Sequence, residues 1–264
     1  MTGLVRLFSG LAVAIAIAAL ARRARALSTS GAVAAALVGT AAVAAGWDWG
    51  ALLVAFFVAS SLLSRVRREQ KTASADGIVG KSDERDAVQV LANGAVFALA
   101  AAAFVAAPGP AWQAVGAGAL AAAAADTWAT EIGMLSPRPP RSIVTLHLVP
   151  PGTSGGVTLL GFLGGALGAA FIEMAALLLQ WPQDVVVAVL VGGLAVTLAD
   201  SLLGALVQQR RWCDACDRAT ERPVHRCGAR TRIVGGIGWL DNDGVNAACT
   251  VVGAAVAYLI AARL

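Results

Sequence analysis

Long apolar segments alternate with short polar segments along the whole chain. A helix that crosses a membrane needs about 20 predominantly apolar residues. Segments of this kind predict eight helices, with seven as the nearest alternative, because the third segment is short and the fifth is interrupted by polar residues. The predicted helices are 4–21, 28–46, 50–64, 87–107, 111–134, 156–180, 184–207 and 243–262. We therefore expect an all-α fold, a polytopic transmembrane helical bundle, with 1–264 as a single integral-membrane domain.

The composition agrees with the pattern. Of the 264 residues, 58% are hydrophobic and 14% are charged, and the mean hydropathy is +0.73. Ordinary soluble domains are about 25% charged. The composition therefore excludes an ordinary soluble domain.

Basic residues indicate how the bundle is oriented. The net charge of +4 and the pI near 9.2 could suggest nucleic-acid binding, yet every Lys and Arg except Arg6 and Arg263 lies in alternate loops. These are the segment after the first helix and the loops 65–86, 135–153 and 208–242. Basic loops remain in the cytosol. We therefore expect both termini outside and a multi-pass protein of the plasma membrane, with no nucleic-acid partner.

The opposite boundary of the predicted bundle is marked by tryptophans. The intervening loops 47–50, 108–110 and 181–184 carry no basic residue. Trp and Tyr are enriched at membrane–water interfaces. This pattern places the following residues at the outer boundary: Trp47, Trp49, Trp112 and Trp181.

Two short sequence matches suggest an internal repeat. "TSGAV" (29–33) resembles "TSGGV" (153–157), and "DAVQ" (86–89) resembles "DGVN" (243–246). Each match opens an even-numbered helix. A parallel repeat of four helices plus four would explain both matches, and chance similarity in an Ala- and Gly-rich sequence is the alternative.

Polar side chains gather at the predicted cytosolic ends of the helices. Asp126 and Asp200 lie inside apolar segments, where an ionisable group costs a few kcal/mol and therefore needs a partner or a function. Capping is the alternative for Asp86 and Asp243, which stand at helix starts. The polar residues at these ends are Asp86, Gln89, Asn93, Asp126, Asp200, Asp243 and Asn246.

The residue types at these ends suit phosphoryl transfer. Carboxylates bind Mg²⁺ together with substrate phosphates, so we expect Asp126, Asp200 and Asp243 to hold Mg²⁺ or to orient the acceptor, in catalytic roles. Asn246 would complete the site. Positive charge is needed to neutralise developing phosphate charge. The candidates for binding substrate or phosphate are Lys81, Arg85, Asp86, Gln89, Asn93, Arg141 and Asn246.

The stretch "PPGTSGGV" (150–157) precedes a predicted helix. Pro150 and Pro151 prevent the preceding loop from continuing as a helix. Two hypotheses remain for the residues that follow: a helix cap, or a turn whose N–H groups bind a phosphate at a helix N-terminus. The candidate phosphate-binding residues are Thr153, Ser154, Gly155 and Gly156.

Cys213, Cys216, His225 and Cys227 form a C-x2-C-x8-H-x-C pattern in the loop 208–242. Three thiols and an imidazole at this spacing resemble a small zinc knuckle, which would be structural. Free thiols in the reducing cytosol are the alternative. Cys249 falls inside the last predicted helix and is assigned to packing.

Five ordered motifs resemble an integral-membrane family of unknown function that includes animal transmembrane protein 19 and the phytyl-phosphate kinase of chloroplasts and cyanobacteria. The motifs are "RDAVQVLANG" (85–94), "ADTWATEIG" (125–133), "VPPGTSGGVTLLG" (149–161), "ADSLLGALVQ" (199–208) and "LDNDGVN" (240–246). That family is distantly akin to the CTP-dependent phytol and dolichol kinases. Asp126, Ala129 and Gly133 match the start of their nucleotide motif, D-x-x-A-x-x-x-G, whereas Pro137 replaces a further glycine.

The resemblance implies transfer of a phosphoryl group from a nucleoside triphosphate, CTP, to an isoprenoid alcohol or its monophosphate. It also implies that Ala129 and Gly133 help to bind the nucleotide. The partners would be a membrane lipid and a nucleoside triphosphate, with Mg²⁺ as cofactor. Two alternatives remain: a transporter or flippase of a lipid phosphate, and a non-catalytic scaffold.

Overall fold

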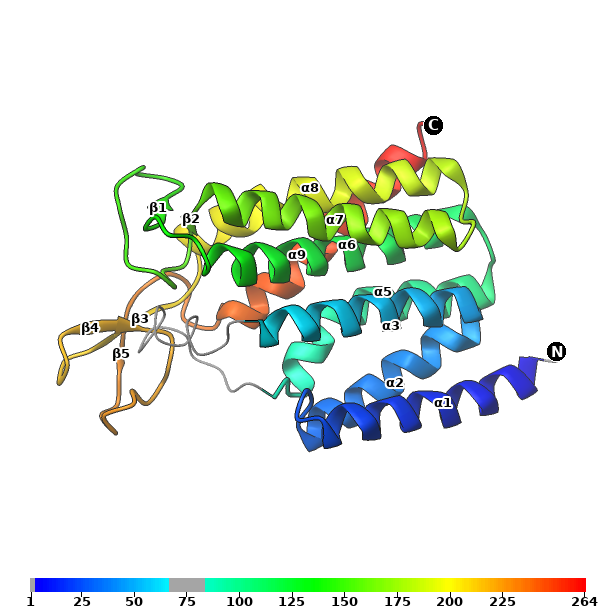
Figure 1. Cartoon of the computed structure of the whole chain (residues 1–264), viewed down its shortest axis with the longest axis horizontal. Helices are drawn as coiled ribbons and strands as arrows, with labels where there is room; N and C mark the ends of the chain where they lie inside the picture. Colours follow the sequence, from blue (N-terminus) through cyan, green and yellow to red (C-terminus); the bar gives the residue numbers. More distant parts are fainter. Residues whose placement is uncertain (1–2, 67–83) are drawn as a thin grey trace.

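The structure is a computed structural model that describes residues 3–66 and 84–264, and in this part of the chain eight helices form one bundle (Figure 1). Six of them are long and apolar enough to cross a membrane, while α2 is apolar but shorter. The predicted polytopic helical bundle is confirmed. The helices are α1 (Gly3–Arg23), α2 (Thr29–Ala45), α3 (Trp47–Arg65), α5 (Ala87–Ala106), α6 (Pro110–Gly133), α7 (Leu159–Leu178), α8 (Gln183–Leu206) and α9 (Asn242–Ala261).

Helix α6 is the centre of the bundle. Every residue from 116 to 125 is buried, around the full circumference of the helix, because α5, α7, α8 and α9 all pack against it. A helix that is apolar on all sides is a buried helix. The run of alanines and glycines in α6 lets its neighbours approach closely.

Glycines of α7 allow one of these close approaches. A Cβ on Gly168 would lie 2.6 Å from the carbonyl oxygen of Ala124, and a Cβ on Gly164 would lie 2.7 Å from that of Trp128. These distances leave no room for a side chain. The glycines therefore bring the backbones of α6 and α7 into contact.

Trp49 corrects one prediction about the outer boundary. Trp47 and Trp112 are exposed, but Trp49 and Trp181 are buried. Trp49 packs against Phe97, Phe104 and Trp181 at ring-centroid distances of 5.1 to 5.3 Å. The reason is that residues 47–50 are not a loop. Helix α3 begins at Trp47, so its first turn directs Trp49 into the core.

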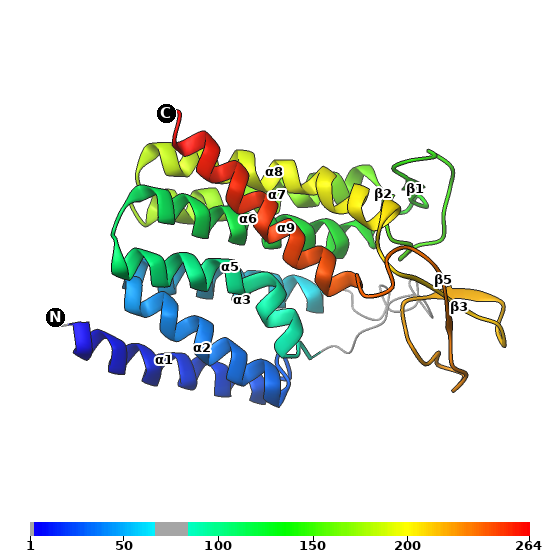
Figure 2. The ribbon, with the colours of Figure 1, turned by 180° about the vertical axis from the view of Figure 1, so that it is seen from behind.

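Short strands occupy one end of the bundle, and both termini lie at the opposite end (Figures 1 and 2). Strands β1 (Arg141–Ser142) and β2 (Gly156–Val157) pair in an antiparallel manner. Strands β3 (Arg210–Cys213), β4 (Arg218–Thr220) and β5 (Arg232–Gly235) form an antiparallel sheet in the order β4-β3-β5. We call this end the loop end. That the loop end faces the cytosol stays a prediction.

The internal repeat also stays a prediction. Helices α2 and α5 start side by side, since Ser28 N–H donates to the carbonyl oxygen of Arg85 at 3.0 Å and Arg85 N–H donates to that of Ala26 at 3.1 Å. The corresponding helices of the second half do not start together. Helix α7 lies in front of α6 in Figure 1, whereas α9 lies in front of α6 in the reverse view of Figure 2.

Candidate functional site

Asp126 and Asp200 meet at the loop end of the bundle. Asp126 lies on α6 and Asp200 on α8, each about two turns before the end of its helix, and their side chains are within hydrogen-bonding range of each other. Cys249 of α9 joins them, because its Sγ lies 3.7 Å from Asp200 Oδ1. Both aspartates are partly exposed. Three helices thus bring two carboxyl groups and a thiol together.

Asp243 does not join this pair as a third ligand. It is buried in the first turn of α9, six residues before Cys249, which is about 9 Å along the helix axis. Asn246 is half-buried between them. Among the described residues, the one group of three or more side chains arranged to hold a metal ion contains no aspartate. The expected cluster of three aspartates is therefore reduced to the pair Asp126 and Asp200.

Capping explains some of the acids at the helix starts. Asp86 Oδ1 accepts the N–H of Gln89 at 2.9 Å, and Gln89 Oε1 accepts the N–H of Asp86 at 3.1 Å. This reciprocal pair is a capping box. Helix α9 is capped by Asp241, which accepts the N–H groups of Asp243 and Gly244 at 3.1 Å. The capping alternative is thus confirmed for Asp86 but not for Asp243.

A cavity of about 310 Å³ lies between α1, α2, α3 and α5. Its walls are almost entirely apolar, and the lining residues of α3 run from Trp47 to Phe57, a span of about 15 Å. The polar lining residues are Arg85, Gln89, Asn93 and Thr127. Arg85 and Gln89 stand at the loop end, and Thr127 directly follows Asp126. The cavity therefore has its polar end toward the loop end of the bundle, and the described residues that line it include neither Asp126 nor Asp200.

Arg85 is held at the polar end of this cavity. Its Nη1 donates to Ser61 Oγ at 3.4 Å, and its guanidinium carbon lies 5.9 Å from the centre of the Phe57 ring. Burial lowers the pKa of Arg85, and the nearby Glu131 carboxylate opposes that shift. Asn93 donates to the carbonyl oxygen of Gln89 at 3.0 Å. Its buried Oδ1 has no hydrogen-bond partner in the described part of the chain.

The remaining basic candidates differ in position. Lys81 lies outside the described residues. Arg141 is exposed on β1, and its Nη1 donates to the carbonyl oxygen of Leu146 at 2.9 Å. Arg141 therefore fastens its own loop in this structure.

The stretch 150–157 is not a helix start. Gly156 and Val157 form β2, and α7 begins at Leu159 with Thr158 as its cap. The N–H of Gly156 already donates to Thr153 O at 2.9 Å, and Ser154 Oγ donates to Glu221 Oε1 at 3.0 Å. The predicted helix start at 156 is wrong, because pairing with β1 keeps these residues extended. Gly155 has a positive φ of 75° and packs against Ala205 of α8.

Ala129 and Gly133 lie where α6 meets the start of α7. A Cβ on Gly161 would lie 3.0 Å from Ala129 O, and a Cβ on Gly133 would lie 3.2 Å from Gly161 Cα. Helix packing thus explains the small size of Gly133 and of Gly161, which approaches the backbone of Ala129. The structure does not test the nucleotide role that the resemblance implies for Ala129 and Gly133.

The four Cys and His residues of the loop 208–242 do come together. Their ligand atoms all lie within 4.8 Å of one another. Hydrogen bonds from Ala229 N–H and from His225 lower the pKa of Cys227 to about 6. A hydrogen bond with Cys227, followed by burial, raises the pKa of Cys216 to about 11. The predicted residues therefore form one cluster.

The family described as integral membrane protein DUF92 matches residues 12–254. The chain belongs to this family. An uncharacterized membrane protein of Methanocaldococcus jannaschii is 32% identical over 98% of this chain and 96% of its own length. Protein PGR of Arabidopsis thaliana is 32% identical over 83% of this chain and 84% of PGR. Protein VTE6, chloroplastic, of the same plant is 29% identical over 89% of this chain and 65% of VTE6.

No solved structure matches this DUF92 protein. The family assignment confirms the resemblance carried by the five motifs and establishes the chain as an integral membrane protein. Which membrane contains it stays a prediction.

Sequence reasoning missed several parts of the site. The cavity could not be found, because its lining residues come from five helices and look like ordinary lipid-facing or packing residues. Cys249 was assigned to packing, although it also contacts Asp200. One weak feature of the sequence indicated that Glu131 needs a partner such as Arg85: it is an acidic residue near the end of an apolar segment.

Proposed function

We propose that this DUF92 protein is a membrane kinase that transfers a phosphoryl group from a nucleoside triphosphate, CTP, to an isoprenoid monophosphate or alcohol. The observation that carries the proposal is the pair Asp126 and Asp200, which meets at the same end of the bundle as the polar end of an apolar cavity. The five motifs support it, because the family they resemble includes a phytyl-phosphate kinase. A chloroplastic relative is consistent with a substrate of that kind.

The aspartate pair supplies the charge that a phosphoryl-transfer site needs. Two carboxylates in contact repel each other, so a site that contains them favours a bound cation. Mg²⁺ is usually bound by one or two carboxylates together with substrate phosphates. Asp126 and Asp200 fit that requirement without Asp243. When bound there, Mg²⁺ would neutralise charge on the transferring phosphoryl group.

The cavity supplies a place for the acceptor lipid. An isoprenoid tail is apolar and elongated, as are the cavity walls along α1, α2 and α3. Arg85 and Asn93 stand at the polar end, where they would bind a phosphate or hydroxyl headgroup. Thr127 lines the same cavity and is adjacent to Asp126. A headgroup held by Arg85 would therefore lie toward the loop end, which is the end of the bundle at which the aspartates meet.

In the proposed reaction an acceptor oxygen attacks the γ-phosphorus of the nucleotide. The bond between that phosphorus and the β–γ bridging oxygen breaks, and a nucleoside diphosphate leaves. An alcohol acceptor also releases its hydroxyl proton to water, whereas an ionised monophosphate oxygen has no proton to lose. The residues of this chain would position the two substrates and balance charge, which is the main protein contribution to phosphoryl transfer.

The test is to incubate the purified protein in lipid nanodiscs with Mg²⁺ and each of the four labelled nucleoside triphosphates. Prenyl alcohols and prenyl monophosphates of several chain lengths serve as acceptors. We expect labelled prenyl phosphate or diphosphate with CTP as the best donor. The absence of product with every donor and acceptor would contradict the proposal. Movement of a prenyl phosphate across vesicle membranes without nucleotide would instead identify a lipid transporter.

A further inference from the structure

The four-residue cluster of the loop 208–242 has the geometry of a tetrahedral metal site. Cys213 Sγ and Cys227 Sγ are 3.7 Å apart, and His225 Nδ1 is 3.2 Å from Cys227 Sγ. Zinc–sulfur bonds of about 2.3 Å and zinc–nitrogen bonds of about 2.0 Å place two tetrahedral sulfurs about 3.8 Å apart and a sulfur and nitrogen about 3.5 Å apart. A disulfide requires sulfurs about 2.0 Å apart. The observed spacing therefore suits a shared ion rather than a bond.

Two turns deliver the four ligands. Cys213 ends β3, and the turn into β4 brings Cys216 back, with its N–H donating to Cys213 O at 3.3 Å. His225 and Cys227 lie in a second turn before β5, where Gly228 N–H donates to His225 O at 2.9 Å. Ligands presented in pairs from two such turns are typical of small zinc-binding folds.

This sheet has almost no hydrophobic core of its own. Between residues 210 and 240, all of which are described, only Cys213, Thr220 and His225 are buried. The large apolar side chains are exposed instead, as with Ile233, Val234 and Trp239. A small fold without a core is usually stabilised by a disulfide or a metal ion. Two of the three buried residues belong to the cluster.

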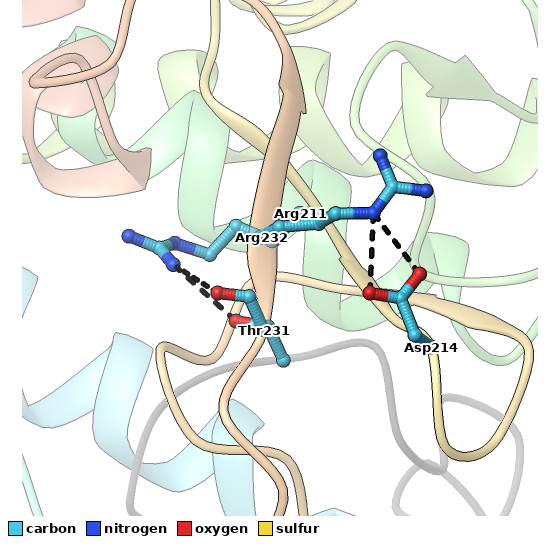
Figure 3. Close-up of polar contacts among 4 residues, drawn as sticks. All are labelled: Arg211, Asp214, Thr231 and Arg232. Atoms are coloured by element: carbon cyan, nitrogen blue, oxygen red, sulfur yellow. Dashed lines mark hydrogen bonds and ion pairs between the residues drawn. The ribbon is translucent and has the colours of Figure 1, made fainter.

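The other contacts within the sheet are weak. Arg232 Nε donates to Asp214 at 3.0 and 3.2 Å, and Arg211 Nη1 donates to Thr231 O and Oγ1 at 3.3 Å (Figure 3). The Arg232–Asp214 side chains are more than 60% exposed, and an exposed ion pair contributes about 1 kcal/mol or less. These contacts alone do not account for an ordered sheet.

His225 adds a separate indication. The residue is buried, and its Nε2 has no hydrogen-bond partner in the described part of the chain. Its other ring nitrogen, Nδ1, faces the Sγ of Cys227 at 3.2 Å. A buried ring nitrogen without a partner is costly, and a metal ion bound at Nε2 would remove that cost.

We propose that Cys213, Cys216, His225 and Cys227 bind one zinc ion, which keeps the three-stranded sheet folded at the loop end of the bundle. Zinc with three thiolates carries a net negative charge, which suits a loop that contains seven arginines and few acids. The site closes on four protein ligands and is therefore structural rather than catalytic. This inference does not depend on the proposed kinase activity.

The zinc-bound sheet would fix a contact with the membrane domain. Glu221 follows β4, and its Oε1 accepts both Ser154 Oγ and Gln208 Nε2 at 3.0 Å. Gln208 lies just after α8, the helix that carries Asp200. By keeping the sheet folded, the ion would hold Glu221 in place. Glu221 in turn links the stretch 150–157 to Gln208 at the end of α8.

The test is metal analysis of the full-length protein purified in detergent without chelators. We expect about one zinc per chain, and loss of that zinc in Cys213→Ser and Cys227→Ser. Cys249→Ser is the matched control, because Cys249 is buried in α9 away from the cluster, and it should retain the metal. Zinc-free wild-type protein in which the three cluster thiols are reactive, or are joined in a disulfide detected by mass spectrometry, would overturn the proposal.

A second measurement does not depend on mutant folding. Wild-type protein is reconstituted with Co²⁺, which should give the visible absorption of a tetrahedral ion and thiolate-to-cobalt charge-transfer bands. A mercurial reagent should release the ion in step with modification of three thiols. An octahedral spectrum without charge-transfer bands would contradict a site with three thiolates.

Discussion

The carboxyl groups of Asp126 on α6 and Asp200 on α8 lie within hydrogen-bonding range of each other, although 74 residues separate them in the chain. Cys249 on α9 contacts the same pair. Three helices therefore converge at one polar point near the loop end of the bundle.

Asp126→Asn and Asp200→Asn should each lower kcat/KM of the proposed kinase by about 100-fold or more, the effect of removing an essential charged group from an active site. The melting temperature should not fall, because each change removes repulsion between two carboxylates. Turnover and thermal unfolding would be measured in parallel. Glu173→Gln is the control, since Glu173 is an acid near the other end of α7. Full turnover in both aspartate variants would contradict the assignment.

Ala35→Phe should raise the KM for the lipid acceptor about tenfold or more and leave the KM for the nucleotide unchanged. Ala35 lines the cavity, and a phenyl ring there would occupy space needed by the lipid tail. Val33→Phe, on the exposed face of the same helix, is the matched control. Equal effects of the two variants on the acceptor KM would show that the cavity does not hold the acceptor.

Arg85→Ala should weaken binding of prenyl monophosphates by about 10- to 100-fold, the usual value of a charge-assisted hydrogen bond, and affect prenyl alcohols less. Acceptor KM values for the two classes provide the comparison. Arg138→Ala, which removes an exposed loop arginine, should change neither. An equal loss for alcohols and monophosphates would mean that Arg85 has a structural role.

Gly168→Ala should destabilise the bundle by about 1–3 kcal/mol, because the added Cβ would lie 2.6 Å from the backbone of α6. A lower melting temperature in detergent would report the change. Gly238→Ala serves as the control, since apart from its chain neighbours only Ile233 Cδ1 would lie near the added Cβ, at an ordinary contact distance of 3.6 Å. If Gly168→Ala melts like the wild type, the close contact of α6 and α7 is not needed for stability.

Ser154→Ala should speed proteolysis within residues 208–242 and leave the nucleotide KM unchanged. The Ser154 hydroxyl is bonded to Glu221, so its loss should free the sheet rather than remove a phosphate contact. Thr145→Ala changes an exposed hydroxyl in the neighbouring loop and should leave the proteolysis rate as it is. A raised nucleotide KM in Ser154→Ala would restore the hypothesis of a phosphate-binding turn.

Much of the helical framework could be predicted, because a membrane requires long apolar segments and each helix satisfies its backbone hydrogen bonds within its own segment. The exceptions were local. Residues 47–50 contain Trp, Asp and Gly and resemble a loop, but they form the first turn of α3 and bury Trp49. The residues around Gly156 resemble a helix start, but they pair with β1. Both exceptions depend on a partner that is distant in the sequence.

The sequence by itself determined that this is a helical membrane protein of the DUF92 family and that Asp126 and Asp200 need a partner or a function, because composition and apolar length decide what a membrane accepts. Only the tertiary structure decided that these two aspartates meet while Asp243 stays apart. It also decided that Arg85 stands at the end of a cavity and that Ser154 holds Glu221. The reason is that helix packing sets which faces meet, and the many interchangeable alanines and glycines do not encode it in any short motif.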